Sequence, residues 1–139
     1  MVLLIDDDAD DREMFREALQ QVAPSVHCLE ADDGDVALFL LSQPDAQLPD
    51  VIFLDLNMPR MNGKQCLIEI KQTDALVHIP VVIYTTSKRV ADVEETKNLG
   101  AVHFITKPAA FDNICQSIGD ALSESWLQEE TQPDPHLSF

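Results

Sequence analysis

The sequence predicts an α/β protein with a doubly wound (βα)5 fold, whose five parallel strands take the order 2-1-3-4-5. Two observations predict this class. Five short apolar runs recur along the 139 residues, and segments with helical spacing of apolar residues separate them. Runs that are apolar without strict alternation are typical of strands buried on both faces. Right-handed crossovers between such strands give an open sheet with helices on both sides.

Each element follows from its own pattern. The expected strands occupy residues 2–5, about 26–31, 51–54, 81–84 and 102–105. Apolar residues three and four apart indicate helices between them. These patterns are formed by Phe15, Ala18, Leu19 and Val22; by Val36, Phe39 and Leu40; by Gly63, Cys66, Leu67 and Ile70; and by Phe111, Ile114, Cys115, Ile118 and Leu122. The segment 89–99 is weakly amphipathic, and Gly100 stands where a helix C-terminal cap is expected.

Length and charge restrict the classes of protein. We expect one domain over residues 1–126, and a tail or short arm over residues 127–139. The net charge is −16, from 9 basic and 25 acidic residues, which disfavours nucleic acid and anionic membranes as partners. No apolar run approaches the ~20 residues that a membrane span needs. No signal peptide is visible and the three cysteines lack metal-binding spacing, so we expect reduced thiols in a cytoplasmic protein.

Polar side chains stand where the expected strands end. Asp6 and Asp7 follow the first strand, and Asp55 follows the third. The first and third strands are neighbours in the predicted order, so these carboxylates should converge at the carboxyl edge of the sheet. Grouped carboxylates repel one another unless a cation binds, and Mg²⁺ takes oxygen ligands. Thr85 and Lys107 end the fourth and fifth strands, where a hydroxyl and an ammonium group can contact a phosphoryl group.

Asp55 is the candidate acceptor of that phosphoryl group. A carboxylate held between a metal ion and a lysine can attack phosphorus and form an aspartyl phosphate. Taken singly, each residue type has an ordinary explanation, because acidic runs cap helices, Lys-Pro pairs lie in loops and threonine is common in strands. Such residues at the ends of four different strands favour one common site.

Over residues 1 to about 125 the chain resembles the receiver domain of bacterial two-component response regulators, the CheY-like proteins. The likeness is in the strings LLIDDD, PDVIFLDLNMPRMNG, PVVIYTTS and GAVHFITKP, in family order and at family spacing. The resemblance implies that Asp55 receives a phosphoryl group from a sensor histidine kinase or a phosphotransfer protein. It also implies a Mg²⁺ site formed by Asp7, Asp55 and the backbone carbonyl of Asn57, with Asp6 orienting a metal-bound water.

The same resemblance assigns the residues that respond to the phosphoryl group. Thr85 would donate a hydrogen bond to it, Lys107 would pair with it, and Phe104 would be the aromatic switch residue. The peptide bond between Lys107 and Pro108 would be cis, which is accessible only before proline.

Three positions depart from the family pattern. Phe104 stands where tyrosine is frequent and therefore lacks a hydroxyl, and Thr86 stands where a small residue is common, which would slow access to Asp55. Leu56 replaces the tryptophan of CheY-type proteins, and the only tryptophan, Trp126, is expected late in the last helix. The threonines after the fourth strand and the C-terminal tail also resemble the stand-alone regulators that are paired with bacterial phytochromes.

We therefore expect a stand-alone receiver that signals through protein contacts on the face formed by segments 89–99, 102–105 and 111–122. A phosphorylation-linked homodimer is one form that such contacts can take. The domain would catalyse only its own phosphorylation and dephosphorylation, and is not expected to be an enzyme in any other sense.

Two alternatives stay open. One is a pseudo-receiver that binds a partner without phosphorylation, although such domains usually lack part of the acidic cluster that this chain keeps. The other is a phosphatase of the haloacid dehalogenase type. That class needs a second aspartate two residues after the nucleophile as its general acid, and Asn57 occupies this position.

Overall fold

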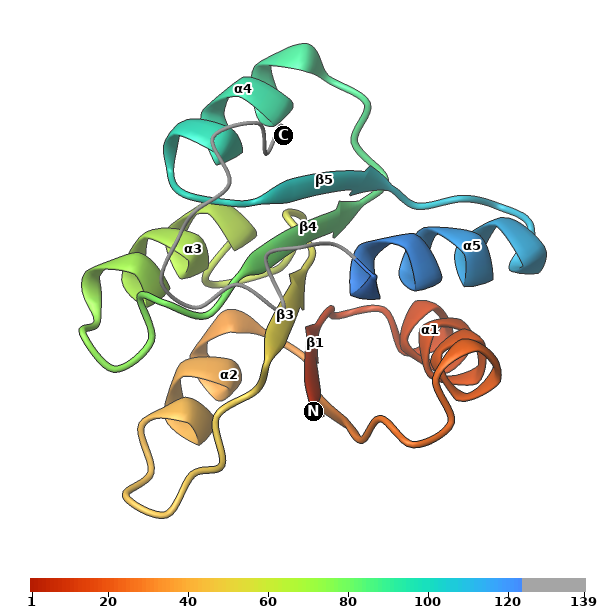
Figure 1. The fold of residues 1–139 in the computed structure, drawn as a ribbon. Helices are drawn as coiled ribbons and strands as arrows, with labels where there is room; N and C mark the ends of the chain where they lie inside the picture. The colour runs from red at the N-terminus through yellow and green to blue at the C-terminus, as the bar shows by residue number, and fades with distance from the viewer. Residues whose placement is uncertain (124–139) are drawn as a thin grey trace.

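The computed structural model describes residues 1–123 and shows one five-stranded parallel sheet in the order β2-β1-β3-β4-β5 (Figure 1). The strands are β1 (Val2–Ile5), β2 (Cys28–Ala31), β3 (Val51–Leu54), β4 (Val81–Thr85) and β5 (His103–Thr106). The helices are α1 (Ala9–Val22), α2 (Gly34–Leu41), α3 (Gly63–Gln72), α4 (Val90–Asn98) and α5 (Phe111–Leu122). The predicted fold class and strand order are confirmed. The expected tail at 127–139, the domain end at 126 and Trp126 lie outside the described residues.

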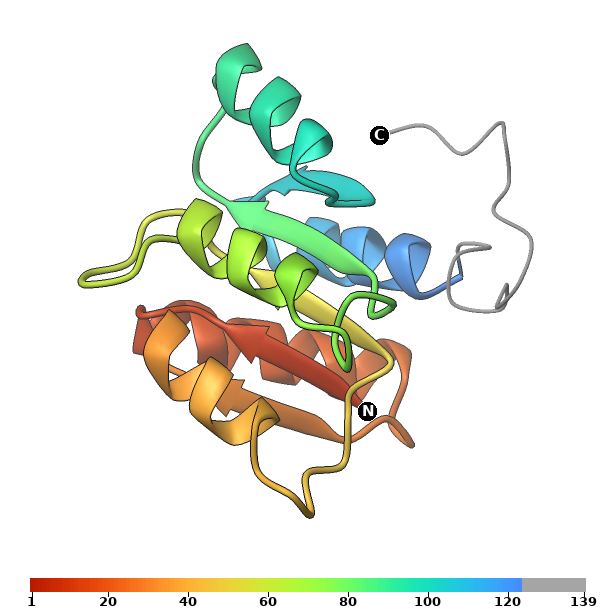
Figure 2. The same ribbon diagram turned by 90° about the vertical axis from the view of Figure 1, so that its left-hand side faces the viewer.

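Helices cover both faces of the sheet (Figures 1 and 2). Alternate residues of β1 point to opposite sides: Val2 and Leu4 pack towards α1 and α5, whereas Leu3 and Ile5 pack towards α2 and α3. The strands β1, β3 and β4 are buried along their whole length, which explains why they read as unbroken apolar runs. No helix within residues 1–123 is both long enough and apolar enough to cross a membrane.

Helix α2 buries a different stripe from the predicted one. Val36 and Phe39 are 40% and 64% exposed, and Leu40 is only partly buried. The residues that the helix buries are Gly34, Ala37 and Leu41. The segment is apolar almost throughout, so spacing alone does not select the inward face. Close packing selects it, because a Cβ atom at Gly34 would lie 3.0 Å from the Met61 sulfur.

Helix α4 is attached to the domain in an unusual way, since its two buried side chains, Asp92 and Thr96, are polar. Val90, in its first turn, is 73% exposed. The predicted weak amphipathicity is therefore confirmed. Gly100, just after this helix, has a φ of 108°, which suits a C-terminal glycine cap.

Gly63, the first residue of α3, brings this helix into direct contact with the segment that follows β3. Its N–H donates a 3.0 Å hydrogen bond to the carbonyl of Leu56. A Cβ atom at this position would lie 2.6 Å from the Leu56 Cα and closer still to the Asp55 carbonyl oxygen. Neither backbone atom can move without displacing Asp55, so the α3 N-terminus fixes the position of that residue.

We predict that Gly63→Ala lowers the free energy of unfolding by about 1–3 kcal/mol or more, because the methyl group overlaps backbone atoms. Urea denaturation measures this loss. The matched control is Gly119→Ala within α5, where a Cβ atom meets no atom of residues 1–123 within 4 Å. That change should stabilise the helix by about 0.5–1 kcal/mol, as alanine usually does relative to glycine. Equal effects of the two substitutions would contradict the packing described for Gly63.

Candidate functional site

Three carboxylates meet at the carboxyl ends of β1 and β3. One oxygen atom from each of Asp6, Asp7 and Asp55 lies within 4.8 Å of the others. The register of the two strands causes this, since Ile5 pairs with Leu54 and the Asp55 N–H donates a 2.9 Å hydrogen bond to the Ile5 carbonyl. Asp6 and Asp55 are buried and Asp7 is exposed. The predicted convergence of these three residues is what the structure shows.

The ammonium group of Lys107 lies among these carboxylates. Its Nζ atom is 2.8 Å from Oδ2 of Asp6, 2.8 Å from Oδ2 of Asp11 and 3.4 Å from Oδ2 of Asp55. Burial lowers the pKa of Lys107, but the three carboxylates outweigh burial and hold that pKa above its ordinary value. Lys107 therefore stays charged and balances part of the negative charge of the cluster.

Asp11 was not among the residues predicted for this site. It lies in the first turn of α1, whose N-cap is Asp8, and its carboxylate reaches Lys107 after β5. The signal was the acidic run from Asp6 to Asp8, because a helix that starts directly after this run keeps its first turn close to the end of β1.

Asp6 shows most clearly that the cluster suits a cation. Burial raises the pKa of its carboxyl to about 6, although Lys107 and the Asp8 N–H lower it. Oδ1 accepts a 2.9 Å hydrogen bond from the Asp8 N–H. Oδ2 lies near the Lys107 ammonium but has no partner in hydrogen-bond geometry among the described residues. Three close carboxylates, two of them buried, form a donor set that fits a hard divalent cation.

Thr85 and Lys107 lie side by side because β4 and β5 are neighbours. The Lys107 N–H donates a 2.7 Å hydrogen bond to the Thr85 carbonyl. Thr85 is fully buried, and its Oγ1 has no hydrogen-bond partner within residues 1–123. Thr86, by contrast, is exposed at the start of the following loop. A buried hydroxyl without a partner is costly, and a ligand with an acceptor oxygen would remove that cost.

The remaining predicted residues lie around this centre. The Asn57 N–H donates a 3.3 Å hydrogen bond to Oδ1 of Asp55, so the backbone of Asn57 turns back towards this carboxylate. Phe104 is partly buried and packs on the side of the sheet that α2 and α3 cover. The expected cis bond between Lys107 and Pro108 is wrong for this structure, where no peptide bond of residues 1–123 is cis. The trans form is the lower in energy by about 0.5–1 kcal/mol for such bonds, and strand pairing through the Lys107 N–H is compatible with it.

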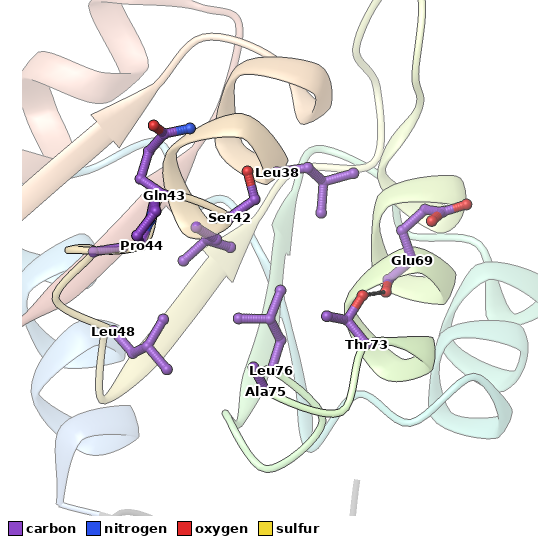
Figure 3. Close-up of a pocket in the computed structure, with 11 residues that line it drawn as sticks. Leu38, Ser42, Gln43, Pro44, Leu48, Glu69, Thr73, Ala75 and Leu76 are labelled. Atoms are coloured by element: carbon purple, nitrogen blue, oxygen red, sulfur yellow. Dashed lines mark hydrogen bonds between the residues drawn. The ribbon is translucent and has the colours of Figure 1, made fainter.

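A cavity of about 540 Å³ lies away from this cluster (Figure 3). Its lining comes from the end of α2, the loop before β3 and the end of α3, and includes Leu38, Leu48 and Leu76. These segments lie at the amino ends of the strands, whereas the aspartates lie at the carboxyl ends. The cavity is mainly apolar and contributes no residue to the carboxylate site.

An ion pair between Arg60 and Asp33 connects the loop after Asp55 to the N-terminus of α2. Arg60 has a φ of 62°, in the left-handed region, which costs a residue with a Cβ atom about 1–2 kcal/mol. Its guanidinium forms an ion pair with the buried Asp33 carboxylate, which also caps α2 by accepting a 2.8 Å hydrogen bond from the Val36 N–H. The bond from Val36 and the contact with Arg60 together lower the pKa of Asp33.

This lowered pKa predicts a pH dependence of stability. A carboxyl whose pKa is lower in the folded state stabilises the fold above its unfolded pKa, and that stabilisation is lost as pH falls through the folded pKa. Asp33→Asn keeps an oxygen for the cap and loses the charge. The parent should therefore exceed the variant in free energy of unfolding at pH 6, and this excess should disappear between about pH 5 and pH 2. Urea denaturation across that range measures it. Asp45→Asn, at an exposed position without an ion pair in the described chain, should show no such excess.

The chain belongs to the response regulator receiver domain family, which it matches over residues 2–119. It is 30% identical over 137 residues to the response regulator Rcp1 of Synechocystis sp., covering 96% of this chain and 92% of that protein. Among solved structures, the phosphorylated cyanobacterial phytochrome response regulator RcpA gives a TM-score of 0.82 at 31% identity, covering 96% of this chain and 97% of that one.

Two further structures bear on the site and the fold. The Mn²⁺-bound form of Rcp1 gives a TM-score of 0.74 at 30% identity and covers 96% of this chain and 98% of that one. The chemotaxis protein CheY4 of Vibrio cholerae gives a TM-score of 0.72 at 26% identity, covering 86% of this chain and 95% of that one. The chain is thus a two-component signalling domain with the fold of CheY.

Proposed function

We propose that this chain is a receiver in which Asp55 accepts a phosphoryl group from a sensor histidine kinase or a phosphotransfer protein. The observation that carries the proposal is that polar groups around Asp55 lack a hydrogen-bond partner or a balancing charge within the described residues. The buried hydroxyl of Thr85 has no hydrogen-bond partner in the described chain. It lies at the edge of the sheet where the carboxylates of Asp6, Asp7 and Asp55 meet and Lys107 contacts Asp55. A divalent cation would offset the repulsion among the carboxylates, and a phosphoryl oxygen would accept the hydrogen bond of the Thr85 hydroxyl.

The transfer itself needs little from the protein beyond position and charge. A carboxylate oxygen of Asp55 forms the new bond to phosphorus while the bond between phosphorus and the donor nitrogen breaks. We propose that Asp6, Asp7, Asp55 and the Asn57 carbonyl hold Mg²⁺, which when bound neutralises charge on the carboxylates and the phosphoryl oxygens. The Mn²⁺-bound form of the relative Rcp1 supports a divalent cation here.

Lys107 and Thr85 would then recognise the phosphoryl group. The Lys107 ammonium now contacts the carboxylates of Asp6, Asp11 and Asp55. When a phosphoryl group is present, the ammonium can donate one of its hydrogen bonds to a phosphoryl oxygen instead. Thr85 would donate the hydrogen bond that its buried hydroxyl now lacks. Thr86 is exposed at the start of the loop after β4, where its methyl and hydroxyl groups would narrow the approach of a phosphoryl donor to Asp55.

The nature of the relatives favours one kind of kinase. RcpA is a cyanobacterial phytochrome response regulator, and AtBRR, with a TM-score of 0.70 at 32% identity, is a bacteriophytochrome response regulator. We propose that the donor to this chain is a histidine kinase of the phytochrome type. The haloacid dehalogenase alternative gains no support, since the position of its general acid is Asn57. The pseudo-receiver alternative is tested by phosphorylation itself.

We predict that acetyl phosphate with Mg²⁺ adds the mass of one phosphoryl group to the intact protein, and that Asp55→Asn abolishes this gain. Asp7→Ala should nearly abolish it, because the cluster then loses a metal ligand. Asp10→Asn, an exposed acid in the first turn of α1, is the control and should label as the parent does. Equal labelling of the parent and Asp55→Asn would remove Asp55 from its proposed role.

Signalling is proposed to use the face formed by α4, β5 and α5. Moving a 1:99 population to 99:1 requires about 5.5 kcal/mol of differential interaction. Two charge-assisted contacts, from Thr85 and Lys107, supply about 1.5–3 kcal/mol each. Phe104 has no hydroxyl to add a hydrogen bond in either rotamer, so we expect a partial shift that a partner or a homodimer completes.

Amide exchange over residues 85–105, with and without beryllofluoride plus Mg²⁺ as a phosphoryl mimic, measures that shift. We expect altered protection across β5 and the loop before α4, accompanied by a change in sedimentation if the partner is a second copy. Unchanged protection in this range, together with unchanged sedimentation, would mean that the site is occupied without any effect on this face.

A further inference from the structure

The buried carboxylate of Asp92 joins its own helix, α4, to the loop that precedes it and to the start of α3, 28 residues earlier in the sequence. The residue is 8% exposed and lies in the first turn of α4. Its Oδ1 accepts a 2.7 Å hydrogen bond from the Lys64 ammonium, and its Oδ2 accepts a 2.5 Å hydrogen bond from the Ser87 hydroxyl. Lys64 and Ser87 together lower the pKa of Asp92, so the carboxylate stays ionised at neutral pH.

Lys64 connects Asp92 to the phosphoryl-acceptor segment. It is the second residue of α3 and follows Gly63, whose packing against Asp55 and Leu56 allows no room for a Cβ atom. The start of α3 therefore cannot move independently of Asp55. An ion pair from Lys64 links α4 to the same rigid part of the domain.

Ser87 connects Asp92 to the loop that leaves β4. It lies two residues after Thr85, and its carbonyl accepts a 2.9 Å hydrogen bond from the Thr106 hydroxyl of β5. Its hydroxyl oxygen also accepts a 3.2 Å hydrogen bond from the Arg89 N–H. The first residues of this loop are thus held towards α4, while the Thr85 hydroxyl beside them has no partner in the described chain.

We propose that Asp92 is a positioning residue: with Lys64, it holds Ser87 and the loop of residues 85–89 in the arrangement of the unphosphorylated domain. The inference rests on the proposed function of Asp55. When Thr85 moves to donate its hydrogen bond to a phosphoryl oxygen, Ser87 has to follow and its hydrogen bond to Asp92 breaks. The contact therefore opposes phosphorylation and sets how much of the domain takes the active arrangement.

The polar character of α4 explains why this contact matters. Asp92 and Thr96 are the buried side chains of the helix, and the Thr96 hydroxyl donates a 2.8 Å hydrogen bond to the Asp92 carbonyl within the same helix. The helix is consequently held through Lys64 and Ser87 more than through apolar packing. Loss of one of these two contacts during activation would loosen the face that is proposed to bind a partner.

The test is the affinity for beryllofluoride in the presence of Mg²⁺, measured by calorimetry on the full chain. Ser87→Ala removes the loop contact without adding bulk, and we expect it to bind the mimic about tenfold more tightly, the value of one hydrogen bond to a charged group. Asp92→Asn should tighten binding in the same direction. The combination of both substitutions should add little to either alone, because they remove the same contact.

Glu95→Gln is the matched control. Glu95 also accepts a 2.6 Å hydrogen bond from Lys64, but its side chain is 54% exposed and has no contact with the loop in the described structure. We expect this variant to bind the mimic as the parent does. A purely structural role of Asp92 would lower the melting temperature of the variants and leave the affinity for the mimic unchanged.

The outcomes separate this inference from the proposed function. If the parent binds the mimic and Ser87→Ala binds it equally tightly, with unchanged amide exchange over residues 85–89, the inference is wrong and the receiver function stands. If the parent does not bind the mimic in the presence of Mg²⁺, both are wrong. Tighter binding by Ser87→Ala with faster exchange in this loop is the result that supports the inference.

Discussion

The whole site depends on the parallel pairing of β1 with β3. Because Ile5 pairs with Leu54, the residues that follow the two strands leave the sheet together, and Asp6, Asp7 and Asp55 converge. Carboxylates this close repel one another, and burial of Asp6 and Asp55 strengthens the repulsion. The Lys107 ammonium offsets part of it. The remaining excess of negative charge is what makes the edge of the sheet receptive to a divalent cation.

A second ion pair, between Lys64 and Asp92, links the segment after Asp55 to α4. The segment after Asp55 is held by the packing of Gly63, and the next residue, Lys64, is paired with Asp92 on α4. Movement at Asp55 and movement at α4 are therefore mechanically related. A helix that is held by an ion pair and a hydroxyl group needs less free energy to move than a helix that buries an apolar stripe. This property of α4 suits a surface that is proposed to change when a phosphoryl group binds.

The fold and the centre of the site could be predicted because both depend on local patterns. The unbroken apolar runs of the central strands mark where they end, and each end carries a polar residue such as Asp6 or Asp55. The inward face of α2 could not be predicted, since nearly every residue from Val36 to Leu41 is apolar and close packing at Gly34 decides the face. The pairing of Lys64 with Asp92 spans 28 residues, and nothing local in the sequence connects the two. The trans bond before Pro108 also could not be inferred from the dipeptide alone.

The convergence of charge at the end of β3 is proposed to make Asp55 the acceptor of a phosphoryl group. The most direct measurement is to reduce the phosphorylated protein with borohydride, which converts an aspartyl phosphate to homoserine, and to sequence its peptides by mass spectrometry. We expect homoserine at position 55. Homoserine at position 6 or 7, or a labelled protein in which position 55 remains aspartate, would contradict it.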